Sequence, residues 1–397
     1  MKFFTLLQLC VSVILMCAVV NVASRYPKGH LEPLGQHQPA IGSVATIDVG
    51  KLGSLEFYRQ YVRTNTPVLI KGALEGTTPV MEWTDQYLAS KFGSEKVNVD
   101  NSKHEDRLKQ STEMQLRKFL SLYSTSKTKY LISTLTKNMQ KEFQLPPALI
   151  CEGFTSRLQD YVMWFSGGRT RSKLHYDNVE NMYCQLGGTK EWFIVDPKDA
   201  KKHIVLDHKE GAFTGVDVTS VDMEKYPGMK DLPWRSAVLT RGDCLYMPLN
   251  WWHQVTSPPS RNLAINIWWA PILKEADDFL CSNHSKTAML SDFEFNYGEW
   301  IRYNLGSFLN EQNNSVNFTT MHKNIVHEHT GEHVISETNF NLLDVNRDGL
   351  VDISELIALP AQTVHMATNY AEIGALNTNG ASRTGDPGSE DDGQDED

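Results

Sequence analysis

The chain is short of basic residues. Its 397 residues include 38 lysines and arginines against 48 aspartates and glutamates, and the formal net charge is −10. The basic residues form no cluster of the kind that binding to a phosphate backbone requires, so we expect no nucleic-acid partner. Part of the acidity lies in the last residues, and 366–397 are predicted to be a disordered acidic tail.

Long apolar runs are also scarce. One run, residues 3–20, follows Lys2, and Val22 and Ser24 then stand at the positions expected around a cleavage site. Residues 1–24 are therefore predicted to be a signal peptide, with an uncleaved membrane anchor as the alternative. No later stretch is apolar enough to cross a bilayer, so we expect no membrane span after the signal is removed.

Cysteine is rare outside this first segment. The chain has 6 cysteines, of which Cys151, Cys184, Cys244 and Cys281 follow the predicted signal peptide. An even number allows up to two disulfides in three possible pairings. Cys184 and Cys244 lie in apolar runs typical of strands, so buried free thiols remain an equal alternative.

Further signals bear on the compartment. Three N-glycosylation sequons begin at Asn283, Asn313 and Asn317, and together with the predicted signal peptide they favour an exposed, lumenal surface. The chain does not end in a Lys-Asp-Glu-Leu-type retention signal. Secretion and residence in the lumen of the endoplasmic reticulum are therefore both open.

The periodicity of apolar residues changes along the chain. Residues 25–45 lack periodicity and are predicted to be a linker. In the next part we expect helices at 55–62, 83–92 and 112–122, and strands at 67–70 and 97–99. Short apolar strands separated by turn signals follow, which predicts a jelly roll: 161–165, 192–195, 237–239, 245–247 and 263–269. A helical extension that carries the sequons is predicted over 276–330, with helices at 275–280 and 292–309.

Three residues have the types and spacing of an iron site. His175 and Asp177 stand two residues apart, so on a strand both side chains project from one face and reach one metal ion. A second imidazole, His253, follows Trp251 and Trp252. Two histidines and one carboxylate form the facial triad of non-haem Fe(II) oxygenases, which leaves coordination positions open for co-substrate and O₂.

The amino-acid sequence around these three residues resembles that of the JmjC oxygenases. Residues 172–181 and 185–190 look like the first metal-binding segment of that family, and 242–253 resembles its run of Gly-Asp, Tyr, Pro and Trp-Trp-His. Residues 264–269 resemble its closing strand. The similarity extends over about 45–275 and is strongest to small JmjC hydroxylases, a group that includes the asparaginyl hydroxylase acting on hypoxia-inducible factor.

The resemblance implies a fold and a set of site residues. The fold is a mainly β, double-stranded β-helix (cupin) with flanking helices, over 46–275. By position, His175, Asp177 and His253 resemble the iron ligands, and Lys190 stands where the family places the cation for the distal carboxylate of 2-oxoglutarate. Matching positions that hydrogen-bond to the same co-substrate are occupied by Ser172, Asn181 and Asn266. Ser172 replaces a threonine common there, and the loop between His253 and Asn266 is shorter than in the asparaginyl hydroxylase.

Residues 335–365 carry a second metal motif, that of an EF-hand. Gly349 stands at the sharp turn of the loop, and the ligand positions are occupied by Asp344, Asn346, Asp348, Leu350 (through its carbonyl), Asp352 and Glu355. We expect a small α-helical module that binds Ca(II) as a structural site. No second loop is visible in the sequence, so this hand pairs with a second chain in a homodimer, packs on the oxygenase domain, or binds weakly.

Two functions from different classes compete. The first is an Fe(II)- and 2-oxoglutarate-dependent dioxygenase that hydroxylates a protein or peptide of the secretory pathway, with release of succinate and CO₂. The second is a catalytically silent JmjC scaffold that binds partners with calcium support. The complete triad and Lys190 favour the enzyme. A histone demethylase fits poorly behind a signal peptide, oxidation of a small molecule or lipid stays open, and no motif names the substrate.

Overall fold

The fold was analysed in a computed structural model. It describes residues 26–104, 111–208, 212–274, 281, 287–326 and 331–368. These form two compact units: the described residues up to 269 together with 281 and 287–295, and the described residues of 270–274 and 296–368. Within the described ranges, no helix combines the length and the apolar composition needed to cross a membrane. The predicted signal peptide, the sequon at Asn283, the helix at 275–280 and the tail beyond residue 368 lie outside the described residues.

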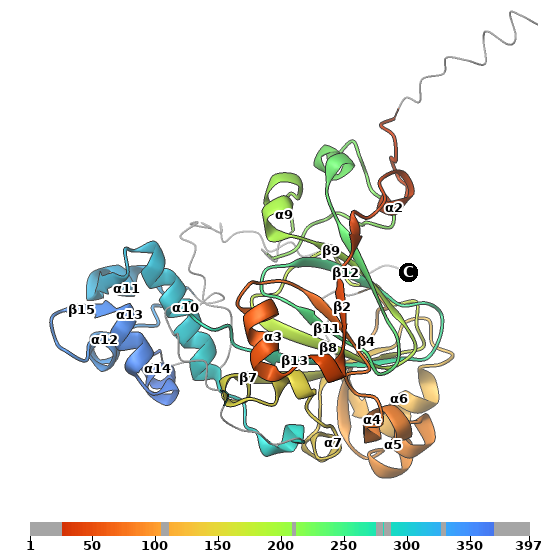
Figure 1. Ribbon diagram of the computed structural model, residues 1–397, viewed down its shortest axis with the longest axis horizontal. Helices are drawn as coiled ribbons and strands as arrows, with labels where there is room; N and C mark the ends of the chain where they lie inside the picture. The colour runs from red at the N-terminus through yellow and green to blue at the C-terminus, as the bar shows by residue number, and fades with distance from the viewer. Residues whose placement is uncertain are drawn as a thin grey trace, which may run out of the picture. The chain divides into compact units, whose positions relative to one another are not determined.

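Two β-sheets make up the first unit (Figure 1). Among the described residues, one sheet has four strands in the order β1 (Gly42–Ser43), β10 (Arg235–Leu239), β9 (Lys190–Val195) and β12 (Trp252–Thr256). The other has nine, in the order β2 (Ala45–Asp48), β3 (Val68–Lys71), β11 (Cys244–Met247), β8 (Glu180–Gly187), β13 (Asn262–Trp269), β7 (Leu158–Ser166), β6 (Tyr130–Thr134), β4 (Lys96–Asp100) and β5 (Thr112–Gln115). The predicted cupin-like jelly roll, mainly β with flanking helices, is confirmed.

The two sheets face each other across a shared core. Because successive side chains of a strand point to opposite faces, each strand contributes alternate residues to it. One buried cluster joins Trp192 and Ile194 of β9 with Tyr183 of β8 and Leu245 of β11, so both sheets line the same interior. The candidate site described below opens from this interior.

Short helices flank the sheets, and Figure 1 shows α4 (Thr78–Glu82), α5 (Asp85–Lys91) and α6 (Leu116–Leu122) together, far from α9 (Pro197–His203). Capping residues begin two of them, because Thr84 accepts a hydrogen bond from Tyr87 N–H and Asp196 from Lys198 N–H. The remaining helices of this unit are α2 (Leu34–His37), α3 (Ser54–Phe57), α7 (Lys137–Gln140) and α8 (Glu152–Thr155).

Two predicted helices differ from the structure. The segment 55–62 is α3 followed by a turn of π-helix at Tyr58–Val62. The segment 112–122 begins as strand β5, which pairs with β4, and turns helical only at Leu116. In β5 the backbone pairing with a neighbouring strand overrode the local helical pattern, because tertiary contacts outweigh weak propensities.

The prediction of a linker over 25–45 is wrong for its second half. Leu34 of α2 is 1% exposed and packs in a core cluster with Val218 and Trp252. Strand β1 then pairs in parallel with β10. The segment lacks periodicity because its two elements are too short to display one, yet its backbone and Leu34 are integral to the first unit.

The extension predicted over 276–330 is divided between the units. Residues 280–295 belong to the first: Leu145 N–H donates to Ala288 O, Leu290 N–H donates to Phe143 O, and Cys281 is bonded to Cys151. The second unit takes the helix α10, which spans Tyr297–Glu311 and not 292–309 as predicted. It continues with β14 (Ser315–Asn317), α11 (Phe318–Asn324), α12 (Glu337–Leu343), β15 (Leu350–Asp352), α13 (Ile353–Ala358) and α14 (Ala361–Ala367).

The four cysteines form two disulfides, and the alternative of buried free thiols is not adopted. Besides the pair above, Cys184 is bonded to Cys244. These two residues stand directly opposite each other on the neighbouring antiparallel strands β8 and β11. Of the three possible pairings, the structure has the one that closes loops across 130 and 60 residues of sequence.

Candidate active site

Two backbone hydrogen bonds bring His175 and His253 together. His175 N–H donates to His253 O over 3.1 Å, and His253 N–H donates to His175 O over 2.7 Å. His253 lies in β12, whereas His175 lies outside any regular strand and forms two isolated bridges, one to His253 and one to Phe213. The two imidazole centroids are 4.3 Å apart.

Asp177 completes a metal-binding group. Its Oδ1 lies 3.8 Å from His175 Nε2, and its Oδ2 lies 3.7 Å from His253 Nε2. One ligand atom from each of the three residues falls within 4.8 Å of the others, and both imidazoles are buried. The three residues that were predicted from spacing therefore converge on one point.

The histidine tautomers suit a metal. His175 Nδ1 lies 2.8 Å from Lys173 O, and His253 Nδ1 lies 2.9 Å from Trp251 O. A carbonyl oxygen only accepts, so each Nδ1 carries the proton and each Nε2 keeps its lone pair. Two neutral imidazoles and one carboxylate, with both Nε2 atoms turned toward Asp177, are the donor set that Fe(II) oxygenases use.

The segment that carries Asp177 is tied to the turn before His253. Asn250, at a φ of 65°, donates its N–H to Asp177 O over 2.9 Å. One residue earlier, Leu249 N–H donates to the buried carboxylate of Glu180, which also accepts from Tyr246 OH over 2.7 Å. Burial raises the pKa of Glu180 to about 7, and these two donors oppose the rise. These contacts, together with the bridge between His175 and His253, fix the positions of the three predicted ligands relative to one another.

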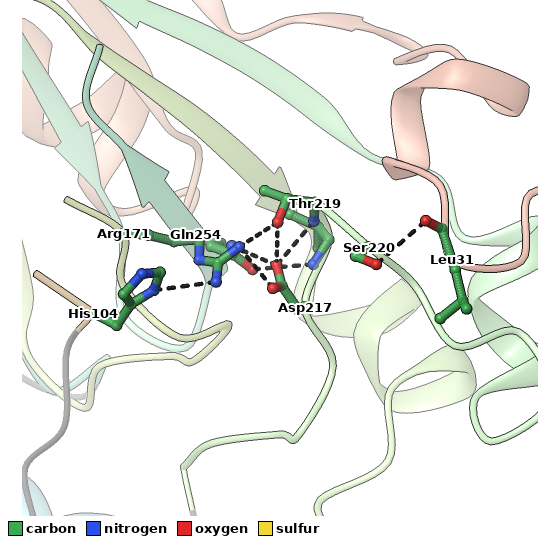
Figure 2. A network of polar contacts seen from close by, with 8 residues as sticks. Leu31, His104, Arg171, Asp217, Thr219, Ser220 and Gln254 are labelled. Atoms are coloured by element: carbon green, nitrogen blue, oxygen red, sulfur yellow. Dashed lines mark hydrogen bonds and ion pairs between the residues drawn. The ribbon is translucent and has the colours of Figure 1, made fainter. Parts of the chain in front are cut away.

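A network of polar contacts beside β12 connects the segment before Ser172 with the segment after His253 (Figure 2). Arg171, which precedes Ser172, forms an ion pair of 2.7 Å with Asp217 and lies 3.1 Å from His104 Nδ1. Gln254, which follows His253, donates to the same Asp217 carboxylate over 3.3 Å. The network connects the backbone before Ser172 with the backbone after His253 through the loop that contains Asp217.

The three predicted ligands open into a cavity of about 500 Å³, a volume that includes part of the solvent at its open mouth. Every residue that was predicted to contact the co-substrate lines this cavity. The lining consists of Tyr130, Trp164, Thr170, Ser172, His175, Asp177, Asn181, Tyr183, Lys190, Trp192, His253, Val255, Asn266 and Trp268.

Lys190 lies among aromatic side chains on the cavity wall. It is 3% exposed, and its Nζ lies 3.4 Å from Tyr130 OH and within 6 Å of the ring centroids of Tyr130 and Tyr183. Burial, and then the neighbouring Tyr130, raises the pKa of Tyr183 well above its usual value, so this phenol stays neutral. The rings hold the ammonium group by cation–π attraction at the edge of the cavity.

The other three residues that were predicted to contact the co-substrate differ in whether their side-chain oxygens already accept a hydrogen bond within the protein. Ser172 Oγ accepts from Val255 N–H over 2.9 Å, and Asn266 Oδ1 accepts from Trp164 Nε1 over 2.9 Å. Asn181 Oδ1 is buried and has no hydrogen-bond partner. An unpartnered buried amide oxygen is costly, and in the wall of a cavity it fits a site that a polar molecule completes.

Sequence reasoning missed half of the cavity wall. Most of the missed residues lie two positions from a predicted one, on the same strand or segment: Thr170, Tyr183, Trp192, Val255 and Trp268. The adjacent Trp268 and Trp269 face opposite sides of β13: Trp268 lines the cavity, whereas Trp269 is fully buried against Tyr246. Tyr130 and Trp164 come from strands without any predicted site residue.

The cupin barrel and its two-histidine, one-carboxylate group define a class, that of the JmjC-type oxygenases that depend on 2-oxoglutarate. Residues 54–275 match the family model described as "Cupin-like domain", and the chain belongs to this family. The similarity to the JmjC family that was inferred from the motifs is thus confirmed.

Several curated proteins are also similar to this chain in sequence. The chain is 25% identical to the Jumonji C domain-containing protein 5 of Drosophila melanogaster over 60% of its own length and 63% of that protein. It is 25% identical to the Lysine-specific demethylase 8 of Xenopus tropicalis, over 58% and 54%. It is 24% identical to the human Bifunctional peptidase and (3S)-lysyl hydroxylase JMJD7, over 54% and 80%. The chain thus spans between half and two thirds of the first two relatives.

Substitution of Asp177 by asparagine tests the metal site. The change keeps the size of the side chain but removes its negative charge. Two neutral imidazoles would then be left to bind the cation without a charged ligand. We expect the affinity for Fe(II), measured by anaerobic equilibrium dialysis, to fall by more than about 100-fold, since loss of an outer partner alone costs about 10- to 100-fold. Asp231→Asn, at an exposed position, is the control; equal affinities of the two variants would refute the site.

Proposed function

We propose that this chain is an Fe(II)- and 2-oxoglutarate-dependent dioxygenase that hydroxylates a protein side chain in the secretory pathway. The observation that carries the proposal is that His175, Asp177 and His253 share one cavity with Ser172 and Lys190. Iron ligands without a site for the co-substrate would leave the reaction without its two-electron donor.

Each residue has a defined task in this reaction. Bound iron supplies oxygen activation coupled to oxidative decarboxylation of 2-oxoglutarate. Lys190 would pair with the distal carboxylate of the co-substrate, because a buried ammonium forms a strong charge-assisted hydrogen bond with it. The buried rings of Trp192 and Tyr183 exclude water around that ion pair, which strengthens it further.

The names of the relatives support a side-chain substrate. They assign lysyl hydroxylation to the human relative and lysine-specific demethylation to the Xenopus relative. The alternative, a catalytically silent scaffold, would need neither the tautomers fixed by Lys173 O and Trp251 O nor a buried Lys190. Those features favour activity.

The compartment is proposed from the covalent chemistry. Disulfides persist in oxidising environments, and Cys151–Cys281 and Cys184–Cys244 use all four cysteines after the first segment. Two of the sequon asparagines, Asn313 and Asn317, are exposed. Both features support a lumenal or secreted enzyme.

Formation of succinate tests the enzyme directly. Purified protein supplied with Fe(II), O₂, 2-oxoglutarate and extracts of lumenal proteins is expected to release succinate above the level of His175→Ala, because that variant lacks an iron ligand. His365→Ala, outside the site, should behave as wild type. Wild-type turnover no greater than that of His175→Ala, with iron bound, would refute the enzyme and favour the scaffold.

Replacement of Lys190 by methionine tests the co-substrate site. Methionine fills similar space without the charge, so we expect the KM for 2-oxoglutarate to rise roughly 10- to 100-fold, the range for a lost hydrogen bond between charged groups. Iron affinity should stay the same, because Lys190 is not a ligand. Lys201→Met, exposed on α9, is the matched control; an unchanged KM in Lys190→Met would remove this residue from the site.

We also propose a calcium site in the second unit. Asp344 is 4% exposed and Glu355 is 9% exposed, and Asp344 Oδ1 is buried without any hydrogen-bond partner. Gly349, at a φ of 86°, makes the turn and donates its N–H to Asp344 Oδ2 over 3.0 Å. A buried, unpartnered carboxylate oxygen needs a cation, and the residues around it are the ligand types that Ca²⁺ takes.

Glu355→Gln tests the calcium site. Asn346 N–H donates to one carboxylate oxygen of Glu355 and Asp352 N–H donates to the other, so glutamine removes the negative charge and keeps an acceptor for one of these two N–H groups. We expect the affinity for Ca²⁺, measured by calorimetric titration of the full chain, to fall by at least roughly tenfold, because ligand charge sets the affinity of such loops. Glu337→Gln, exposed on α12, should bind as wild type. Equal affinity of both variants would contradict the site.

A further inference from the structure

A short β-ribbon joins the proposed calcium loop to a part of the chain that carries no metal-binding motif. Strand β14 pairs antiparallel with β15, and β15 contains Leu350 and Asp352 of the loop. Val316 stands opposite Val351, and these side chains are 4% and 0% exposed. Ile353 N–H extends the pairing by donating to Asn314 O over 3.2 Å. One strand of the ribbon, β15, therefore lies entirely within the proposed calcium loop.

The elements around β14 repeat those around β15. Helix α10, a loop, β14 and helix α11 follow one another in the order in which α12, a loop, β15 and α13 do. In the first set the loop and strand, residues 312–317, read Gln-Asn-Asn-Ser-Val-Asn and contain no carboxylate. A calcium-binding loop needs several carboxylates. The segment from α10 to α11 therefore has the order of elements of an EF-hand, but its loop and strand lack the calcium ligands.

Helix α10 holds the exit helix of the calcium hand. Arg302, which is 6% exposed, donates through Nη1 to Leu356 O and to Ile357 O, the latter over 3.1 Å, at the end of α13. A guanidinium group is favourable there, because the last carbonyls of a helix lack partners and carry partial negative charge. Glu299, one turn earlier on α10, forms an ion pair of 3.1 Å with Arg302 and fixes its direction.

Glycines allow the close approach of α10. A Cβ on Gly306 would lie 2.7 Å from a methyl carbon of Leu273 and 3.3 Å from one of Ile353, the first residue of α13. A Cβ on Gly298 would lie 2.1 Å from Ala361 O, so this position requires glycine. Both ends of α13 are thus in contact with α10 side chains or backbone.

From these contacts we infer that residues 297–324 form a second, calcium-free hand, which is the partner of the calcium hand in the same chain. The inference rests on the calcium site proposed above. An edge strand offers unpaired N–H and C=O groups to other chains, and β14 occupies the edge of β15. The module therefore needs no second copy of the chain, it takes one Ca²⁺, and ordering of the ligands is transmitted to residues that bind no metal.

Substitution of Val316 tests whether the pairing of β14 with β15 supports the binding of Ca²⁺. Val316→Asn places a polar group opposite Val351 without touching a ligand, so a weaker ribbon should lower the Ca²⁺ affinity by roughly tenfold, a typical coupling between linked sites. Leu342→Asn, an exposed position on α12, is the matched control and should bind as wild type. Calorimetric titration of the full wild-type chain should give one Ca²⁺ per chain, and light scattering should give a monomer with and without Ca²⁺.

A second measurement needs no variant. Hydrogen exchange of the full wild-type chain, followed by mass spectrometry, should show that Ca²⁺ slows exchange in a peptide covering 312–317 as well as in 344–355.

The outcomes separate the two proposals. A wild-type chain that binds no Ca²⁺ refutes the calcium site and this inference with it. Binding of one Ca²⁺ with equal affinity in Val316→Asn and Leu342→Asn, or slowed exchange in 344–355 alone, refutes only the partner hand. Dimers that appear on addition of Ca²⁺ would likewise overturn it in favour of pairing between two chains.

Discussion

The candidate iron site depends on one reciprocal pair of backbone hydrogen bonds, between His175 and His253. Neither histidine could be held so close to the other by side-chain contacts alone, because both Nδ1 atoms are already engaged with carbonyls of their own segments. The bridge sets the separation of the imidazoles, and the contact of Asn250 with Asp177 O sets the third ligand. Main-chain geometry of this kind keeps ligands in place before any metal arrives, which is what an open catalytic site requires.

The rest of the barrel supports that bridge. The two sheets supply opposite walls of the cavity, with Lys190 and Trp192 from the four-stranded sheet and Asn181, Tyr183 and Asn266 from the nine-stranded sheet. The disulfide Cys184–Cys244 joins two strands of the second wall. In the second unit, the ribbon of β14 and β15 and the buried Arg302 join the segment around α10 to the segment proposed to bind calcium.

Much of the site could be predicted from sequence, because ligands and co-substrate residues sit in motifs with fixed spacing. The period of two along a strand would also have supplied Tyr183, Trp192 and Trp268 from their predicted neighbours. Tyr130 and Trp164 could not be found this way, since only the strand order β8-β13-β7-β6 brings them to the cavity. The segment 297–324 escaped detection for a related reason: its loop and strand, 312–317, lack the carboxylates that make a calcium loop recognisable, and only the pairing of β14 with β15 reveals the likeness.

The central claim is that one cavity binds Fe(II) and 2-oxoglutarate together, on His175, Asp177 and His253. Visible absorption spectroscopy of the anaerobic protein tests it most directly. Binding of the 2-oxo acid to an iron ion held by these three residues would give a charge-transfer band between metal and co-substrate. We expect 2-oxoglutarate to produce this band in the Fe(II)-loaded wild-type protein, and saturation to require a far higher concentration of it in Lys190→Met. A protein that binds Fe(II) with full occupancy and gives no band at any concentration of 2-oxoglutarate would contradict it.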